Sequence, residues 1–366
     1  MSETASTIIA DEKNSKATTK AYPAKAYAAK SAASGLAPAS IKRREPGPHD
    51  VQIQILYCGV CHSDLHQVRN EWENMMPTVY PCVPGHEIVG RVVDVGSAVK
   101  KFKAGDLAAV GCLVDSDRTC PNCRAGYESS CVHREFVGGC QAEAVRVPLA
   151  DGTLVATPAP PDPGHIPSLL ALSDVMGTGW WAAVAAEVTP GSTVAVVGDG
   201  AVGLCGVLAA RELGAGRIIV MSRHEPRQKL ALEFGATDIV TERGDDGAAI
   251  IREMTEGVGA DAVLECVGTP ESMQQALHST RPGGNVGFVG VPHGVEVNGE
   301  ELFYSHVGLR GGPAPVRRFL PDLITRVLDG RIDPGMVFDL TLPLDEVAEA
   351  YRAMDERRAV KVLLQP

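Results

Sequence analysis

Residue types that bind zinc gather in the first half of the sequence. Cys61 and His86 supply a thiolate and an imidazole, and Glu87 directly follows the histidine. A catalytic zinc is held by three donors of these kinds and keeps a fourth position open. Asp174 is the third candidate ligand, with Glu87 as an alternative or exchanging one. This set, called here the Cys61 cluster, predicts a metal that polarises a substrate oxygen.

A second group of candidate ligands lies closer together in the sequence. Its members are Asp117, Cys120, Cys123 and Cys131, called here the Cys120 cluster. Four closely spaced donors favour a closed tetrahedral zinc site, and crowded cysteines in a large chain favour metal over disulfides. The alternative is that the cysteines are reduced thiols in a loop without metal. Cys112 is a fallback ligand with poorer spacing.

A glycine-rich segment has the form that dinucleotide binding requires. The apolar run Val194–Val197 precedes G-x-G-x-x-G and the helical stretch Leu204–Leu213 follows it. Gly198 permits a tight turn, Gly200 lets the backbone approach a pyrophosphate, and Gly203 lets helix and strand pack closely. A lone motif is often only a turn, but this setting predicts a nucleotide site at the helix start. The predicted cofactor-binding residues here are Gly198, Gly200, Ala201, Val202 and Gly203.

The next strand of that domain indicates which nicotinamide cofactor is preferred. It ends in the segment 220–224, about 20 residues beyond the loop, where NAD enzymes carry an acid that binds the ribose hydroxyls. No carboxylate stands there, and Ser222 with Arg223 leaves room and positive charge for a 2′-phosphate. We therefore expect NADP(H) to be preferred over NAD(H). If Arg223 only faces solvent, both cofactors would be accepted.

The elements that must position these residues differ along the chain. Residues 1–22 are rich in Ser, Thr, Ala and Lys without periodicity, so a disordered tail is expected. Short apolar strands broken by Pro and Gly follow, with strands expected at 51–57 and 87–95. A Pro-rich stretch, 158–167, precedes a helix predicted from Leu169 to Ala186.

The second half has the rhythm of a parallel sheet with crossover helices. Its predicted strands are Val194–Val197, Arg217–Met221, Asp261–Cys266 and Asn285–Val289. The C-terminal region, with helical stretches and a last strand at 359–364, is expected to return to the first domain. The predicted fold class is α/β. A β-rich catalytic domain spans 23–180 and 316–366, and a doubly wound cofactor domain of Rossmann type spans 181–315.

Bulk properties exclude several functions. A chain of 366 residues is long enough for about two domains. Its net charge of -11 repels phosphate backbones and anionic lipid, so neither nucleic acid nor membrane is expected as a partner. The sequence has no run of 18 apolar residues and no signal-peptide core, which favours a cytoplasmic location.

From residue 24 onward these motifs together resemble the zinc-dependent medium-chain alcohol dehydrogenases. The resemblance implies a GroES-like catalytic domain, a catalytic zinc in the Cys61 cluster and a structural zinc in the Cys120 cluster, where Asp117 replaces the usual cysteine. It also implies a proton relay from Ser63 through the cofactor ribose to His66, with Asp64 orienting His86. Ser63 and His66 would otherwise be helix-capping and surface residues.

Two branches of that family are represented. Residues 61–90 resemble the cinnamyl alcohol dehydrogenases, which reduce aldehydes with NADPH and normally use Cys as third ligand, whereas Asp174 and its surroundings resemble bacterial zinc alcohol dehydrogenases. A divergent member and a chimera both remain open. The resemblance implies hydride transfer between NADP(H) and a small or aromatic alcohol, aldehyde or ketone, by a homodimer or homotetramer. Alternatives are a polyol or threonine-type dehydrogenase and, more remotely, a non-catalytic cofactor-binding protein.

Overall fold

The computed structural model describes residues 7–9, 21–74, 76–110, 116–134, 138–158 and 160–366. The chain forms two compact units: residues 1–174 with 320–366, and residues 175–319. The sequence alone places these boundaries a few residues away, at 180/181 and 315/316. No helix in the described ranges is both long and apolar enough to cross a membrane.

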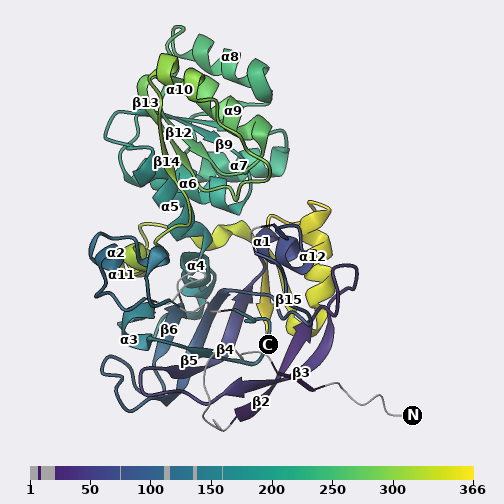
Figure 1. The fold of residues 1–366 in the computed structure, drawn as a ribbon. Helices are drawn as coiled ribbons and strands as arrows, with labels where there is room; N and C mark the ends of the chain where they lie inside the picture. The colour runs from purple at the N-terminus through teal and green to yellow at the C-terminus, as the bar shows by residue number, and fades with distance from the viewer. Residues whose placement is uncertain (1–6, 10–20, 75, 111–115, 135–137, 159) are drawn as a thin grey trace. The chain divides into compact units, whose positions relative to one another are not determined.

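The first unit is built on a sheet of seven strands, most of them antiparallel (Figure 1). The strand order is β15-β16-β4-β5-β6-β8, and β7 also pairs with β4. The strands are β4 (Val51–Gly59), β5 (Glu87–Val95), β6 (Leu107–Val110), β7 (Ala144–Val147), β8 (Leu154–Ala156), β15 (Phe338–Pro343) and β16 (Lys361–Gln365). Because β16 pairs with β4, the C-terminal segment does return to this domain.

A smaller sheet and short helices complete this unit. The sheet has the order β1-β3-β2, formed by β1 (Thr7–Ile9), β2 (Ala21–Ala28) and β3 (Ala37–Arg44), so a strand lies within the segment expected to be a disordered tail. Residues 21 and 22 of that segment begin β2, and residues 1–6 and 10–20 are outside the described residues. The helices are α1 (His62–Val68), α2 (Pro121–Arg124), α3 (Ala150–Thr153), α4 (Ile166–Leu172) and α12 (Val347–Asp355), with α11 (Val316–Leu328) leading back into the unit. Single 3-10 turns lie at Glu128–Ser130, Pro163–His165, Pro334–Val337 and Leu344–Glu346.

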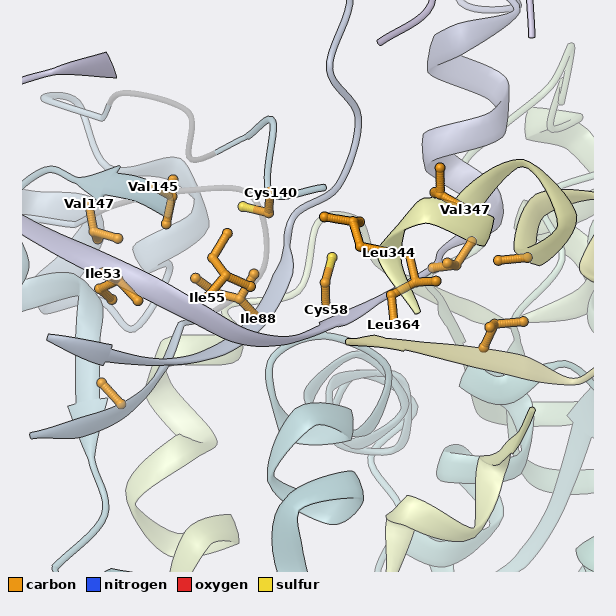
Figure 2. Close-up of a cluster of buried hydrophobic side chains, with 14 of the residues drawn as sticks. Ile53, Ile55, Cys58, Ile88, Cys140, Val145, Val147, Leu344, Val347 and Leu364 are labelled. Atoms are coloured by element: carbon orange, nitrogen blue, oxygen red, sulfur yellow. The ribbon is translucent and has the colours of Figure 1, made fainter. Parts of the chain in front are cut away.

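Alternation along β4 creates the core of this unit. Val51, Ile53 and Ile55 are buried at every second position, as a strand with one face in the core requires. Figure 2 shows Ile53 and Ile55 gathered with side chains from β5, β7, β16 and α12, and Val51 belongs to the same buried cluster. The result is a rigid sheet whose strand ends can hold polar groups in fixed positions.

The second unit contains a six-stranded parallel sheet in the order β11-β10-β9-β12-β13-β14. Its strands are β9 (Thr193–Val197), β10 (Arg217–Met221), β11 (Asp238–Val240), β12 (Ala260–Glu265), β13 (Thr280–Phe288) and β14 (Gly308–Gly311). Its helices are α5 (Val175–Ala185), α6 (Ala201–Glu212), α7 (Glu225–Phe234), α8 (Gly244–Met254), α9 (Pro270–Ser279) and α10 (Gly299–Ser305). Helices α5 and α6 lie on one side of the strands and α8 and α9 on the other (Figure 1).

The strand order reverses between β9 and β12, which is where doubly wound sheets bind ligands at the carboxyl ends of their strands. The predicted doubly wound architecture is confirmed. Strands β11 and β14 were not expected from the sequence, because three or four residues carry too little periodic signal. The glycine-rich loop follows β9 directly, so it lies at the switch point.

The single helix expected from Leu169 to Ala186 is wrong. The structure has two helices, α4 and α5, interrupted at Ser173 and Asp174. The Ser173 hydroxyl donates to the carbonyl of Leu170 at 2.7 Å, a local bond that competes with the helical ladder. The interruption places Asp174 at the end of α4, outside a regular helix, and the boundary between the two units falls there.

Truncation of the core of the first unit tests this packing. Ile53 is fully buried, so Ile53→Ala should lower the free energy of unfolding by about 2–5 kcal/mol, and Ile53→Val by about 0.5–1.5 kcal/mol. Urea unfolding followed by circular dichroism measures both. Val93→Ala, at a side chain that is 42% exposed, is the control. Equal losses for Ile53→Ala and Val93→Ala would contradict the assigned core.

Candidate metal and cofactor sites

The Cys61 cluster is assembled at adjoining strand ends of the first unit. Cys61 follows β4 and is the N-cap of α1, whereas His86 and Glu87 lie at the start of β5. Strands β4 and β5 are antiparallel partners, with Gly59 opposite Glu87, so the end of one strand meets the start of the other. Asp174 arrives from the end of α4, which packs on both strands. The four candidate ligand atoms all lie within 4.8 Å of one another.

Asp64 fixes the orientation of the histidine in this cluster. Its Oδ1 accepts hydrogen bonds from Gly85 N–H at 3.1 Å and lies 2.8 Å from His86 Nδ1. Its Oδ2 accepts the N–H of Cys61 at 3.1 Å. With Nδ1 engaged, His86 Nε2 faces Asp174 Oδ2 at 3.4 Å. The imidazole thus turns its second nitrogen toward the other donors, as carboxylate-oriented ligand histidines do.

Lys361 is a member of this site that the sequence analysis missed. It opens β16, is 1% exposed, and donates from Nζ to Glu87 Oε1 at 2.7 Å and to the Val60 carbonyl at 3.1 Å. A Cβ placed on Gly59 would lie 2.1 Å from Glu87 Oε2, so glycine leaves the space that this carboxylate occupies. The sequence signal for Lys361 was a single charged residue within the otherwise apolar strand predicted at 359–364.

The electrostatics of the cluster fit a bound divalent cation. Burial raises the pKa of Glu87 to about 7 although Lys361 opposes the shift, and burial together with Asp174 raises the pKa of the Cys61 thiol. Burial also disfavours ionised Asp174, but its contacts with His86 outweigh this and leave its pKa low. Glu87 Oε2 is buried, and no donor in the described part of the chain meets the geometric criterion for a hydrogen bond to it. Sulfur, nitrogen and oxygen donors around one point form a donor set that zinc accepts.

Ser63 and His66 lie on α1 beside this cluster. The Ser63 hydroxyl donates to Cys61 Sγ at 3.1 Å, which places it next to a candidate ligand atom. His66 is partly exposed, its Nδ1 contacts Glu71 Oε2, and its ring centroid lies 5.6 Å from that of Trp72. The helix therefore carries one hydroxyl at the buried end of the site and one imidazole nearer solvent.

The Cys120 cluster brings its four candidate ligand atoms within 4.8 Å of one another. All three cysteines are buried together, and the pKa of Cys120 falls to about 7 because the backbone N–H groups of Cys123 and Val132 donate to it. The low pKa of Cys120 favours the thiolate, the form that binds metal, whereas burial raises the pKa of Cys123 to about 12. Cys112 lies outside the described residues. The donor set fits a closed zinc site.

Asp117 is held firmly within that cluster. Its Oδ1 accepts the N–H groups of Thr119 and Cys120 at 2.7 and 3.0 Å, and His133 Nδ1 lies 2.5 Å from its Oδ2. These hydrogen bonds lower the pKa of Asp117 although burial opposes the shift. His133 was missed in the sequence because it stands outside the ligand spacing, although it is only two residues beyond Cys131.

The glycine-rich loop has the geometry that its sequence requires. Gly198 has φ of +116°, in the region where side chains are strained. A Cβ on Gly203 would lie 2.0 Å from the carbonyl oxygen of Gly198, so helix α6 can approach β9 only with glycine there. A Cβ on Gly200 would meet no described heavy atom within 4 Å. Ala201 and Val202 open α6, whose first N–H groups face this space as a site for an anion.

The end of β10 holds a network of polar groups. The Ser222 hydroxyl donates to Asp199 Oδ2 at 2.8 Å, and Arg227 Nη1 donates to Asp199 Oδ1 at 3.2 Å. Ser222 and Asp199 are buried, whereas Arg223 is exposed. The sequence analysis singled out Ser222 and Arg223 but missed Asp199, inside the glycine motif, and Arg227, on the first turn of α7.

Comparisons with known proteins agree with this arrangement. The family described as "Alcohol dehydrogenase GroES-like domain" matches residues 47–159, and "Zinc-binding dehydrogenase" matches residues 201–314. A probable zinc-binding alcohol dehydrogenase of Mycobacterium tuberculosis is 36% identical over 84% of this chain and 79% of its own. An aldehyde reductase of Escherichia coli is 34% identical over 90% of this chain and 94% of its own.

Two further likenesses concern the cofactor and the fold. An NADP-dependent isopropanol dehydrogenase of Entamoeba histolytica is 31% identical over 86% of this chain and 88% of its own. The solved structure of an alcohol dehydrogenase from a Thermus species superposes with a TM-score of 0.83 at 28% identity, covering 93% of this chain and 99% of that one. This chain therefore belongs to the zinc-dependent medium-chain alcohol dehydrogenases, the oxidoreductases that interconvert alcohols and aldehydes with a nicotinamide cofactor.

Proposed function

We propose that this chain interconverts a small or aromatic aldehyde or ketone and its alcohol with NADP(H) as the preferred cofactor. Cys61, His86 and Asp174 hold the catalytic zinc. The observation that carries the proposal is that donors from three distant parts of the sequence meet within 4.8 Å. Sequence relatives named as an aldehyde reductase and an NADP-dependent isopropanol dehydrogenase support the substrate class and the cofactor.

Within this proposal the protein side chains divide the work. When bound, zinc supplies Lewis acidity toward the substrate oxygen, and the nicotinamide ring gives or accepts the hydride. Asp64 holds His86 in the orientation that presents Nε2 to the metal. Lys361 holds Glu87 Oε1, which keeps this carboxylate beside the three ligands, where it would serve as an alternative or exchanging ligand of a bound zinc.

Ser63 and His66 serve proton transfer. The Ser63 hydroxyl lies beside Cys61 Sγ, so it can take the proton of a substrate alcohol that binds at the same centre. His66 lies nearer solvent on the same helix, and an imidazole exchanges protons with water near neutral pH. The two residues are thus the proposed ends of the proton relay.

The second unit supplies the nucleotide site. The open space in front of Gly200, at the start of α6, accepts the pyrophosphate. Ser222, Arg223 and Arg227 surround the position of the adenosine ribose, where two guanidinium groups favour a 2′-phosphate. We assign the Cys120 cluster to a structural zinc, because it offers four protein ligands and no open position.

Replacement of the ligand sulfur tests the proposed catalytic site. Cys61→Ser should lower the turnover rate with benzaldehyde about 1,000-fold or more, because a neutral hydroxyl is a poor ligand for zinc. NADPH binding, measured by nucleotide fluorescence, should be unchanged. Zinc content should fall from two ions per chain to about one. Cys205→Ser, at a buried cysteine outside both clusters, is the control. Normal turnover by Cys61→Ser would rule out the zinc mechanism.

An acid introduced at the end of β10 tests the cofactor preference. Ser222→Asp should lower the ratio of kcat/KM for NADPH to that for NADH at least about tenfold, because the new carboxylate repels the 2′-phosphate and accepts a ribose hydroxyl. Steady-state assays with both nucleotides measure the ratio. The control is Ser222→Asn, because asparagine is nearly the same size as aspartate but carries no charge. This variant should change the ratio less than Ser222→Asp does. An unchanged ratio in Ser222→Asp would refute the preference.

The buried ion pair behind the Cys61 cluster can be examined through stability. Lys361→Met leaves Glu87 as an unpaired buried acid and should cost about 3–5 kcal/mol in the free energy of unfolding. Adding Glu87→Gln should restore part of this loss, and Lys361→Arg should cost less than Lys361→Met. Urea unfolding of the zinc-loaded proteins, with zinc content measured in parallel, separates loss of the pair from loss of metal. Equal stability of the single and double variants would contradict the coupling.

A further inference from the structure

A carboxylate lies at the end of β10, although it belongs to a residue outside that strand. Dinucleotide domains that take NAD place Asp or Glu at the end of the second strand, where it binds the ribose 2′-hydroxyl. Here β10 ends at Met221, and the next residue is Ser222. The carboxylate of Asp199 nevertheless lies at this point, because its Oδ2 accepts the Ser222 hydroxyl at 2.8 Å. The acid comes from the glycine loop after β9.

We propose that Asp199 determines the use of NAD(H): its carboxylate accepts the ribose 2′-hydroxyl in place of the missing strand-end acid, so the enzyme binds NAD(H) as well as NADP(H). This inference rests on the proposed nicotinamide-dependent function. It adds a second cofactor to the NADP(H) preference argued above and names the residue responsible. The glycine loop thus supplies both the pyrophosphate cradle and the ribose acceptor.

Asp199 has the acceptor capacity that this role requires. A carboxylate offers about four acceptor positions on its two oxygens. Ser222 occupies one on Oδ2, and Arg227 occupies one on Oδ1, so each oxygen keeps a free position for a hydroxyl. The backbone beside it is also fixed, since Gln228 Nε2 donates to the Ser222 carbonyl at 2.9 Å. A ribose hydroxyl would therefore meet a carboxylate already oriented by the protein.

Arg227 explains how the same place can receive a phosphate. Its side chain is 12% exposed and lies against Asp199, whose side chain is 11% exposed, so a partly buried guanidinium offsets the carboxylate charge. Only Nη1 contacts Asp199. The other guanidinium nitrogens carry further N–H donors, which suit a phosphate. Arg223, exposed at the strand end, adds a second positive charge. The Asp199–Arg227 pair can therefore bind either cofactor: Asp199 accepts a ribose 2′-hydroxyl, and Arg227 donates to a 2′-phosphate.

The test uses the full-length zinc-loaded enzyme and the fluorescence of reduced nucleotides. Asp199→Asn keeps the size of the side chain and removes the charge. The Kd for NADH should rise about tenfold, whereas the Kd for NADPH should stay equal or fall, because a negative charge near the phosphate has been removed. The matched control is Asp238→Asn: Asp238 begins β11 in the same unit and forms an ion pair with Arg217, and its replacement should change neither Kd.

A second variant shows that the charge itself is responsible. In the Asp199→Asn background, Ser222→Asp moves the carboxylate to the strand end and should return the Kd for NADH to within about threefold of the wild-type value. An unchanged Kd for NADH in Asp199→Asn would overturn the inference. So would an equal loss for both nucleotides, because Asp199 would then only shape the loop. Tighter binding of NADH than NADPH by the wild type would refute the NADP(H) preference and leave the role of Asp199 standing.

Discussion

The first unit must hold the acidic groups of the Cys61 cluster close together in its interior. Burial raises the pKa values of Cys61 and Glu87, whereas contacts with His86 keep the pKa of Asp174 low, and at 4.8 Å or less the three groups repel one another once ionised. Lys361 and His86 offset part of this repulsion from within the protein. A divalent cation bound among these donors would offset the rest, and its binding would then stabilise the first unit.

The seven-stranded sheet makes this concentration of charge possible. Strand β4 lies between β5 and β16, so the ends of three strands meet at Gly59, whose partners are Glu87 on one side and Leu363 on the other. A shift of one residue in either pairing would turn Glu87 or Lys361 to the opposite face of the sheet. The buried alternation of Ile53 and Ile55 favours one register over the first part of β4, although the pairing with β5 shifts between Ile55 and Tyr57, before Gly59 is reached.

Local spacing explains which features could be predicted from the sequence. The doubly wound sheet follows from periodic apolar runs, and the Cys120 cluster and glycine loop are recognised because their members lie within about 15 residues. The interruption at Ser173 was missed, since a single side-chain hydrogen bond decides it against a helical pattern. Lys361 could not be identified because its partner Glu87 is 274 residues away, and only the pairing of β16 with β4 brings them together.

A common arrangement connects the three sites. Each has a carboxylate whose partner is a basic side chain outside the recognised motif: Lys361 for Glu87, His133 for Asp117 and Arg227 for Asp199. Without such partners, a buried carboxylate would take up a proton and lose its value as a ligand or acceptor. The motif residues therefore specify the chemistry of each site, whereas the partners keep the carboxylates usable. In a chain with net charge -11, where acids outnumber bases, the placement of these few cations determines which buried acids can function.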